Sequence, residues 1–161
     1  MVKYLVMDVD GTLTDGKIYI GTEGEIFKAF DVKDGYAIHY ILPEYGITPV
    51  VITGRNSVIL EKRCAEIGIK LLFQGVNDKI TLLRDILKGE SLASVAYIGD
   101  DLNDVECMRQ IKDEGGLIGC PSDAVNQVKQ LAVFQSSKTG GNGAVREFIE
   151  EIINNHSHEN V

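Results

Sequence analysis

Two aspartates, one residue apart, stand at the end of the first apolar run of the sequence. The stretch "YLVMDVDGTLTDG", residues 4–16, places Asp8 and Asp10 directly after the hydrophobic residues of a predicted strand. Neighbouring carboxylates repel each other, and they are costly to bury unless a cation or a reacting group lies between them. Their position therefore predicts a site for a metal ion or for catalysis.

Further polar residues follow other predicted strands in the same way. Thr53 comes after "TPVVI", and Lys79 begins a predicted helix after "LLFQGVND". Three acids, Asp100, Asp101 and Asp104, come after "SVAYIG". In open α/β sheets the ligand lies beyond the carboxyl ends of the strands, so these side chains should converge there. Such a set suits Mg²⁺, which prefers carboxylates, phosphate oxygens and water as ligands.

The elements that position these residues alternate along the chain as short apolar runs and amphipathic segments. Strands are predicted at residues 3–10, 48–54, 70–75, 94–101 and 115–120, and helices at 56–68, 78–87, 103–111 and near the C-terminus. Near-continuous apolar strands flanked by helices indicate a parallel sheet covered on both faces, so we predict a doubly wound α/β fold. One domain should occupy residues 1–155, and the polar segment 156–161 should be a disordered tail.

The segment 17–30 interrupts this alternation. Its sequence, "KIYIGTEGEIFKAF", contains two alternating halves around a glycine-containing turn, which predicts a β-hairpin that projects beside the paired aspartates. Ile18, Ile20 and Phe27 give this ribbon an apolar face that it cannot bury alone. We therefore expect a second copy of the chain to cover the hairpin.

Charge and composition exclude several classes of partner. The net charge of −8 over 161 residues opposes nucleic acid binding, which depends on Lys and Arg. No apolar run is long enough to span a bilayer and no signal-peptide pattern is present, so we expect no membrane partner and a cytoplasmic location. The cysteines, Cys64, Cys107 and Cys120, lack metal-type spacing and should be buried, reduced thiols.

The strand-end residues resemble the motif set of the haloacid dehalogenase-like (HAD) phosphohydrolases. "DVDGT", "VVITG", Lys79 and "GDDLND" match the four motifs of that family in order, and the match covers nearly the whole chain. The resemblance implies a HAD-like Rossmannoid fold in which Asp8 attacks phosphorus to form an aspartyl-phosphate. It implies that Asp10 protonates the leaving alkoxide and then deprotonates the hydrolytic water. Thr53 and Lys79 would bind the transferring phosphoryl oxygens.

The same resemblance implies a Mg²⁺ site. The Asp8 and Asp100 carboxylates and the Asp10 backbone carbonyl would hold the ion, which neutralises charge on the phosphoryl group. Two roles stay open for Asp101 and Asp104, because these side chains either orient water molecules bound to the metal or cap the next helix.

The chain leaves no room for the cap domain with which many members of this family select substrates. Only the hairpin and one helix follow the first motif, and only one helix and one strand separate Thr53 from Lys79. The capless layout resembles the phosphatases of 3-deoxy-D-manno-octulosonate 8-phosphate (KDO 8-phosphate), homotetramers of lipopolysaccharide sugar synthesis. The similar stretches are "DGKIYIGTEGEIFKAFDVKDGYAI", "ITGRNSVILEKRC", "FQGVNDK", "YIGDDLND" and "GGNGAVREFIEE". The resemblance implies hydrolysis of KDO 8-phosphate to KDO and phosphate.

This resemblance also implies a set of substrate-binding residues. They are Asp31, Val32, Lys33, Asp34, Gly35, His39, Arg55, Arg63 and Lys79. Arginine suits the phosphate and the carboxylate of a 2-keto acid, because its planar fork donates two parallel hydrogen bonds. The glycine-rich C-terminal region of that group reaches an adjacent active site, which makes Arg146 a further candidate. We therefore expect a homotetramer with shared sites, in which deletion of residues 139–161 weakens catalysis and preserves the oligomer.

Three alternatives remain at this stage. The first is a phosphatase for a nine-carbon 2-keto sugar acid 9-phosphate. The nine-carbon subgroup tends to have Glu at the position of Arg55, so Arg55 favours the eight-carbon substrate. The second is a phospho-receiver signalling module, but its phosphorylated aspartate would follow the third strand, where this chain has "LLFQG". The third is a non-catalytic oligomerising domain, which would leave the four motifs unexplained.

Overall fold

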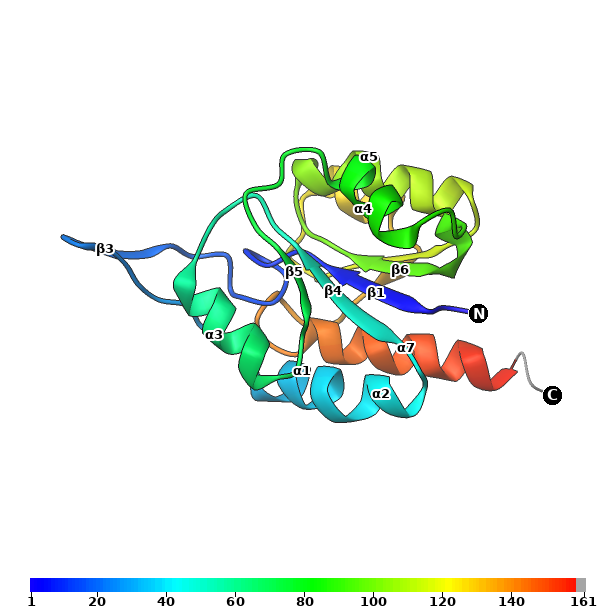
Figure 1. Ribbon diagram of the computed structural model, residues 1–161, viewed down its shortest axis with the longest axis horizontal. Helices are drawn as coiled ribbons and strands as arrows, with labels where there is room; N and C mark the ends of the chain where they lie inside the picture. Colours follow the sequence, from blue (N-terminus) through cyan, green and yellow to red (C-terminus); the bar gives the residue numbers. More distant parts are fainter. Residues whose placement is uncertain (159–161) are drawn as a thin grey trace.

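The computed structural model describes residues 1–158, and for residues 156–158 it describes the backbone alone. Within this range a six-stranded parallel sheet forms the centre of the molecule, in the order β5–β4–β1–β6–β7–β8 (Figure 1). Its strands are β1 (Tyr4–Met7), β4 (Thr48–Ile52), β5 (Leu71–Phe73), β6 (Val95–Ile98), β7 (Leu117–Cys120) and β8 (Phe134–Gln135). The predicted doubly wound α/β fold is confirmed, and the short edge strand β8 is an addition to the five predicted strands.

Helices cover both faces of the sheet (Figure 1). One face carries α4 (Lys79–Leu87), the short 3₁₀-helix η2 (Leu92–Ser94), α5 (Leu102–Asp113) and α6 (Asn126–Leu131). The other carries α1 (Val32–Tyr36), the π-helical turn η1 (Ala37–Ile41), α2 (Leu42–Glu44), α3 (Val58–Glu66) and α7 (Ala144–His158). The sheet is therefore the middle of three layers.

The strand sequences explain this layering. In β1, Leu5 and Met7 pack into the core beneath α7, whereas Val6 packs into the core beneath α4 and α5. The same alternation recurs in β6, where Ile98 faces the first core and Tyr97 faces the second. Because successive side chains of a strand point to opposite faces, a strand that is covered on both faces needs apolar residues at every position.

The C-terminal helix α7 closes one of these two cores. Val145, Phe148, Ile149 and Ile152 are fully buried, and their spacing places them on one face of the helix. The helix continues to His158, so the first residues of the segment predicted to be a disordered tail have helical backbone. Residues 159–161 of that predicted tail lie outside the described part of the chain. The predicted buried thiols are confirmed, since Cys64, Cys107 and Cys120 are all buried and free.

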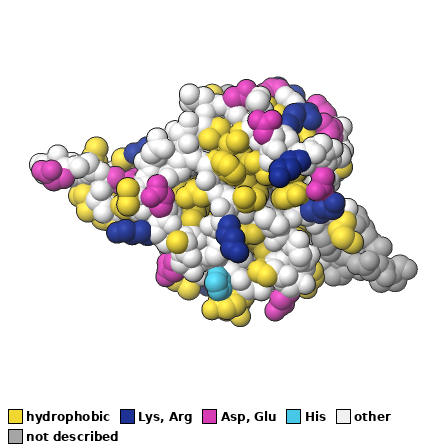
Figure 2. Space-filling view, in the orientation of Figure 1, with side chains coloured by type: hydrophobic (Ala, Val, Ile, Leu, Met, Phe, Trp, Pro, Cys, Tyr) yellow, Lys and Arg dark blue, Asp and Glu magenta, His cyan; other side chains and the backbone are white. Residues whose placement is uncertain are grey.

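The predicted hairpin is confirmed as a separate antiparallel pair, β2 (Tyr19–Gly21) and β3 (Gly24–Phe27), which projects from the molecule (Figure 1). Tyr19 stacks on Phe27 with the ring centroids 4.2 Å apart. Figure 2 shows apolar side chains gathered on this projection. The exposed ones are Ile18, Ile20, Ile26 and Phe27, between 45% and 70% exposed. Among residues 1–158, no helix has both the length and the apolar character needed to cross a membrane.

Candidate active site

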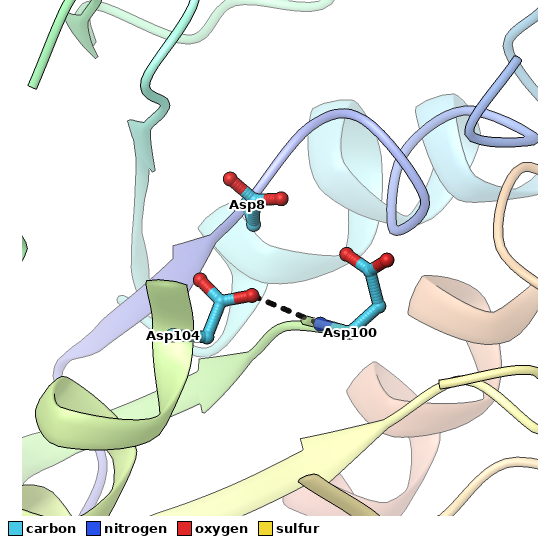
Figure 3. A group of neighbouring side chains, drawn as sticks. All are labelled: Asp8, Asp100 and Asp104. Carbon is cyan, nitrogen blue, oxygen red and sulfur yellow. Dashed lines mark hydrogen bonds between the residues drawn. The ribbon is translucent and has the colours of Figure 1, made fainter. Parts of the chain in front are cut away.

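The sheet brings the predicted catalytic residues to one edge. Asp8 follows β1, Thr53 follows β4 and Asp100 comes two residues after β6. These three strands are parallel neighbours, so their carboxyl ends lie side by side. Figure 3 shows the carboxylates of Asp8, Asp100 and Asp104 converging from β1, the end of β6 and α5.

The centre of the site is a group of three acids and one lysine, all buried except the half-buried Asp100. Lys79 Nζ donates hydrogen bonds to Asp8 Oδ1 at 2.6 Å and to Asp104 Oδ1 at 2.7 Å. One oxygen each from Asp8, Asp100 and Asp104 lies within 4.8 Å of the others. The predicted convergence of acids and a cation is therefore present. Because the group has only one lysine for three acids, it keeps a net negative charge.

Burial and mutual repulsion perturb the acids of this group. Burial and then the charge of Asp104 raise the pKa of Asp8 to about 6, against the opposing effect of Lys79. Burial, followed by the charges of Asp8 and Asp104, raises the pKa of Asp100 to about 8. Burial lowers the pKa of Lys79, but the charges and hydrogen bonds of Asp104 and Asp8 outweigh this and raise it. A hard cation between Asp8 and Asp100 would relieve this repulsion.

Asp104 is already saturated with hydrogen-bond donors. Its Oδ1 accepts hydrogen bonds from Lys79 and from the buried Tyr97 hydroxyl at 2.6 Å, and its Oδ2 accepts from the backbone N–H groups of Asp100 at 3.0 Å and Asp101 at 3.3 Å. A carboxylate offers about four lone-pair sites, so these donors occupy the oxygens that a metal would need. Asp8 and Asp100 are therefore the better-placed ligands, and Asp104 orients Lys79.

Asp101 caps the helix that carries Asp104. Its side chain accepts a hydrogen bond from the Leu102 N–H at 2.7 Å, and together with Asp104 it forms a capping box at the start of α5. Of the two roles left open for these acids by the sequence, helix capping is the one that the geometry displays for both.

Asp10 makes different contacts. Its Oδ1 accepts a hydrogen bond from Lys28 Nζ at 2.6 Å, and its Oδ2 lies 3.8 Å from Arg55 Nη1. Asp8, Asp10, Thr53 and Arg55 line a depression of about 380 Å³ that Asp101 also borders. The structure thus places the predicted nucleophile, the predicted proton-transfer residue and two predicted phosphate- or substrate-binding residues at one opening.

The remaining predicted substrate-binding residues lie elsewhere on the chain. Val32, Gly35, His39 and Arg63 border a second depression of about 350 Å³ between α1 and α3, and the two depressions have no lining residue in common among the described residues. Within a single chain, these predicted residues are therefore not brought to the opening beside Asp8.

Asp31 and its neighbours act locally at the start of α1. The Asp31 side chain caps this helix by accepting hydrogen bonds from the backbone N–H groups of Lys33 at 2.7 Å and Asp34 at 3.1 Å. Asp34 is buried and accepts a hydrogen bond from the Arg146 backbone N–H at the start of α7. The Arg146 guanidinium bonds Glu150 of the same helix. In one chain these residues join α1 to α7.

Sequence reasoning missed the loop that supports Asp100. Thr12 Oγ1 donates a hydrogen bond to Asp100 Oδ1 at 3.0 Å, and Gly11, at φ +93°, lies so close that a Cβ there would be 2.0 Å from Asp100 Oδ2. The C-terminal "GGNG" turn packs beneath this loop, where the Gly141 N–H donates to the Thr12 carbonyl at 3.0 Å. The "DGT" of the first motif was the available signal, but only the fold reveals what Gly11 and Thr12 contact.

The aspartate–lysine centre at the carboxyl edge of a doubly wound sheet defines the chain as a hydrolase of the HAD class. No protein-family model matches the chain. The 3-deoxy-D-manno-octulosonate 8-phosphate phosphatase of Escherichia coli K12 is 40% identical over 154 residues, covering 94% of this chain and 79% of the relative. These similarities, together with those to solved structures, show that the chain belongs to the KDO 8-phosphate phosphatase family of HAD hydrolases.

Solved structures agree with this assignment. A phosphatase of this name from Moraxella catarrhalis, in complex with magnesium, phosphate and KDO, has a TM-score of 0.87 and 41% identity over 95% of this chain and 86% of its own. A probable phosphatase from Pseudomonas syringae has a TM-score of 0.89 and 38% identity over 95% and 85% of the two chains. The resemblance stated from the motifs is confirmed.

Proposed function

We propose that this chain is a Mg²⁺-dependent phosphatase that hydrolyses KDO 8-phosphate to KDO and inorganic phosphate. The observation that carries the proposal is the buried pair of Asp8 and Lys79 beside Asp100, in a chain 40% identical to phosphatases of that name. This arrangement combines a nucleophile, a cation that holds it and a site for a metal. The phospho-receiver and the non-catalytic domain lose their support, because the relatives are named as phosphatases.

Phosphoryl transfer proceeds in two steps in this proposal. Asp8 attacks phosphorus, the bond to the sugar oxygen breaks, and Asp10 gives a proton to that oxygen. Water then attacks the aspartyl-phosphate, Asp10 takes a proton from the water, and phosphate leaves as Asp8 is restored. Lys79 fixes Asp8 through the 2.6 Å hydrogen bond and offers positive charge to the phosphoryl group. Thr53, buried at the end of β4, supplies a further donor.

The residues present fit a magnesium ion. Asp8 offers a buried carboxylate and Asp100 a half-buried one, their raised pKa values reflect burial and then mutual repulsion, and the Asp10 backbone carbonyl would complete the protein ligands. When bound there, the ion supplies charge neutralisation for the transferring phosphoryl group. Asp104 contributes indirectly, since it aligns Lys79 and is itself held by Tyr97.

We also infer a homotetramer with shared active sites. Ile18, Ile20 and Phe27 of the hairpin are exposed, although a stable monomer rarely presents such a ribbon to water. The capless depression beside Asp8 is open, and the candidate substrate residues His39 and Arg63 border a different depression. A substrate can contact both sets only if a second copy brings its own α1 and α3 to the opening.

The proposed reaction is tested by phosphate release from three substrate classes, with Mg²⁺ and with excess chelator. We expect kcat/KM to be highest for KDO 8-phosphate, lower for a nine-carbon 2-keto sugar acid 9-phosphate and lowest for simple sugar phosphates, with no turnover in chelator. A preference for the nine-carbon substrate would replace the eight-carbon assignment. Equal values would leave only a generic phosphatase.

The nucleophile is tested by Asp8→Asn, with Asp113→Asn at the exposed end of α5 as the matched control. The first variant should be inactive with an unchanged circular dichroism spectrum, because the neutral amide cannot form the aspartyl-phosphate. The control should match the wild type. Full activity of Asp8→Asn would overturn the mechanism.

A further inference from the structure

Lys28 is a buried cation at the base of the hairpin. Its side chain is 1% exposed, and its Nζ lies 2.6 Å from Asp10 Oδ1 and 2.9 Å from Glu25 Oε1. Lysine is almost never buried unless it is paired, since an unpaired buried ammonium costs several kcal/mol. The position of Lys28 is therefore tied to its two carboxylate partners, one of which lines the active-site depression.

The second partner anchors this cation to the body of the protein. Glu25 accepts a hydrogen bond from the hydroxyl of Ser57, which caps the start of α3. The chain of contacts runs from the α3 cap through Glu25 to Lys28 and ends at Asp10. Because each member of this chain is buried or half-buried, the hairpin base holds the Asp10 carboxylate in one orientation.

The two oxygens of Asp10 are not equivalent in this arrangement. Oδ1 accepts the 2.6 Å hydrogen bond from Lys28, whereas Oδ2 lies 3.8 Å from Arg55 Nη1, which is beyond hydrogen-bond distance. An oxygen that already accepts a short hydrogen bond from an ammonium is the poorer site for a further proton. Oδ2 is thus the oxygen available for proton transfer.

We propose that Lys28 is a positioning residue that orients Asp10 so that Oδ2 gives and receives the transferred proton. The inference rests on the proposed function, in which Asp10 is the proton-transfer residue. As the bond between phosphorus and the sugar oxygen breaks, the proton leaves Oδ2 for that oxygen. As water attacks the aspartyl-phosphate, Oδ2 takes one proton from the water. Lys28 keeps its own protons in both steps.

This role predicts a dependence on the leaving group that a purely structural role would not produce. An alkoxide leaves only with a proton, whereas p-nitrophenolate leaves without one. The measured quantity is kcat/KM, because it reports the steps up to the first irreversible transfer of the phosphoryl group. Since positioned proton transfer contributes roughly 10²- to 10⁴-fold, Lys28→Met should lower kcat/KM for KDO 8-phosphate by at least about 10²-fold. The loss for p-nitrophenyl phosphate should be much smaller.

Lys17→Met is the matched control, because Lys17 is an exposed lysine of the same hairpin segment. It should behave as the wild type with both substrates. Lys28→Gln is the second variant, since its amide fills similar space and still donates a hydrogen bond. It should lose less activity than Lys28→Met with KDO 8-phosphate, and it decides the question if Lys28→Met does not fold.

Asp10→Asn, assayed in parallel, separates the two layers of the proposal. Full activity of Asp10→Asn would overturn the proposed mechanism itself. The role of Lys28 alone would be overturned by the following combination. Asp10→Asn loses activity in a way that depends on the leaving group, but the folded Lys28 variants show wild-type values or equal losses on both substrates. Leaving-group-dependent losses in both sets of variants support it.

Discussion

Replacing Gly11 by alanine should disturb the proposed magnesium site without touching a ligand. An alanine Cβ would lie 2.0 Å from Asp100 Oδ2 and 2.6 Å from Asp100 Cγ, far inside the distance at which carbon and oxygen can approach. The backbone of Gly11 is held in place, because its neighbour Thr12 bonds both Asp100 and the "GGNG" turn. The Asp100 side chain must therefore move.

Two contributions set the size of the effect. A non-glycine residue at φ +93° costs about 1–3 kcal/mol in strain. Turning Asp100 away from its rotamer adds roughly 0.5–1.5 kcal/mol, and the hydrogen bond from Thr12 is lost with it. Disturbing the partners that orient a metal ligand typically weakens metal affinity by about 10- to 100-fold. We expect the Mg²⁺ concentration that gives half-maximal activity to rise by a similar factor.

The assay combines the Mg²⁺ dependence of phosphate release with the midpoint of thermal unfolding. Gly89→Ala is the control, because Gly89 has a nearly identical φ of +95° and a Cβ there would meet nothing within 4 Å among the described residues. Both variants should lose stability, but only Gly11→Ala should need more Mg²⁺. If the two variants show the same Mg²⁺ dependence, the inferred crowding of Asp100 is wrong.

Two further predictions follow from buried charge and from exposed apolar surface. Burial raises the pKa of Asp34 from an ordinary 3.8 to about 6, so the contribution of this group to the free energy of unfolding should be fully present below about pH 4 and be lost, by up to about 3 kcal/mol, as the pH rises through 6. When urea unfolding is measured between pH 4 and 8, the free energy of unfolding of the wild type should decrease relative to that of Asp34→Asn as the pH rises. Parallel pH profiles of the two proteins would contradict this. Charged residues in place of Ile18 and Phe27 should yield smaller species with weaker substrate binding in sedimentation and kinetic assays, whereas Val133→Glu, at an exposed apolar position away from the hairpin, should not. An active wild-type monomer would count against shared sites.

The convergence of the candidate site residues could be predicted because it depends on a general property of the sheet. The near-continuous apolar residues of β1, β4 and β6 indicate strands that are covered on both faces, and in this sheet these strands are parallel neighbours whose carboxyl ends meet. Asp8 and Thr53 stand directly after β1 and β4, and Asp100 stands two residues after β6. Their proximity therefore follows from the pattern without any knowledge of individual contacts.

The contacts of Lys28 and Tyr97 could not be predicted in the same way. Lys28 lies at the base of the hairpin, where its Nζ reaches Asp10, and an alternating sequence fixes the pairing of a hairpin but not how its base meets the domain. Tyr97 looks like an ordinary core residue of β6, yet its hydroxyl meets Asp104 one turn into α5. Both contacts depend on how separate elements pack against each other. Such packing leaves no local pattern in a single sequence.

The C-terminal region illustrates how a functional expectation can conflict with packing. From the sequence, deletion of residues 139–161 was expected to weaken catalysis and to preserve the oligomer. The structure predicts a different outcome, loss of the fold, because α7 buries Val145, Phe148, Ile149 and Ile152 against the sheet. Burial of each such side chain contributes roughly 1.5–3 kcal/mol, so their loss is comparable to the whole stability of a domain.

The same deletion would also remove the turn that supports Gly11 and Thr12. A loss of activity after truncation would therefore report an unfolded core or a displaced Asp100, whatever the region does for a neighbouring subunit. Arg146 offers a narrower probe of that second role, since its guanidinium contacts Glu150 on the same helix and lies over the Tyr36 ring, outside the buried face of α7. Substituting such a surface side chain leaves the buried face of α7 intact, so it can test whether this region contributes to an adjacent active site without disturbing the core.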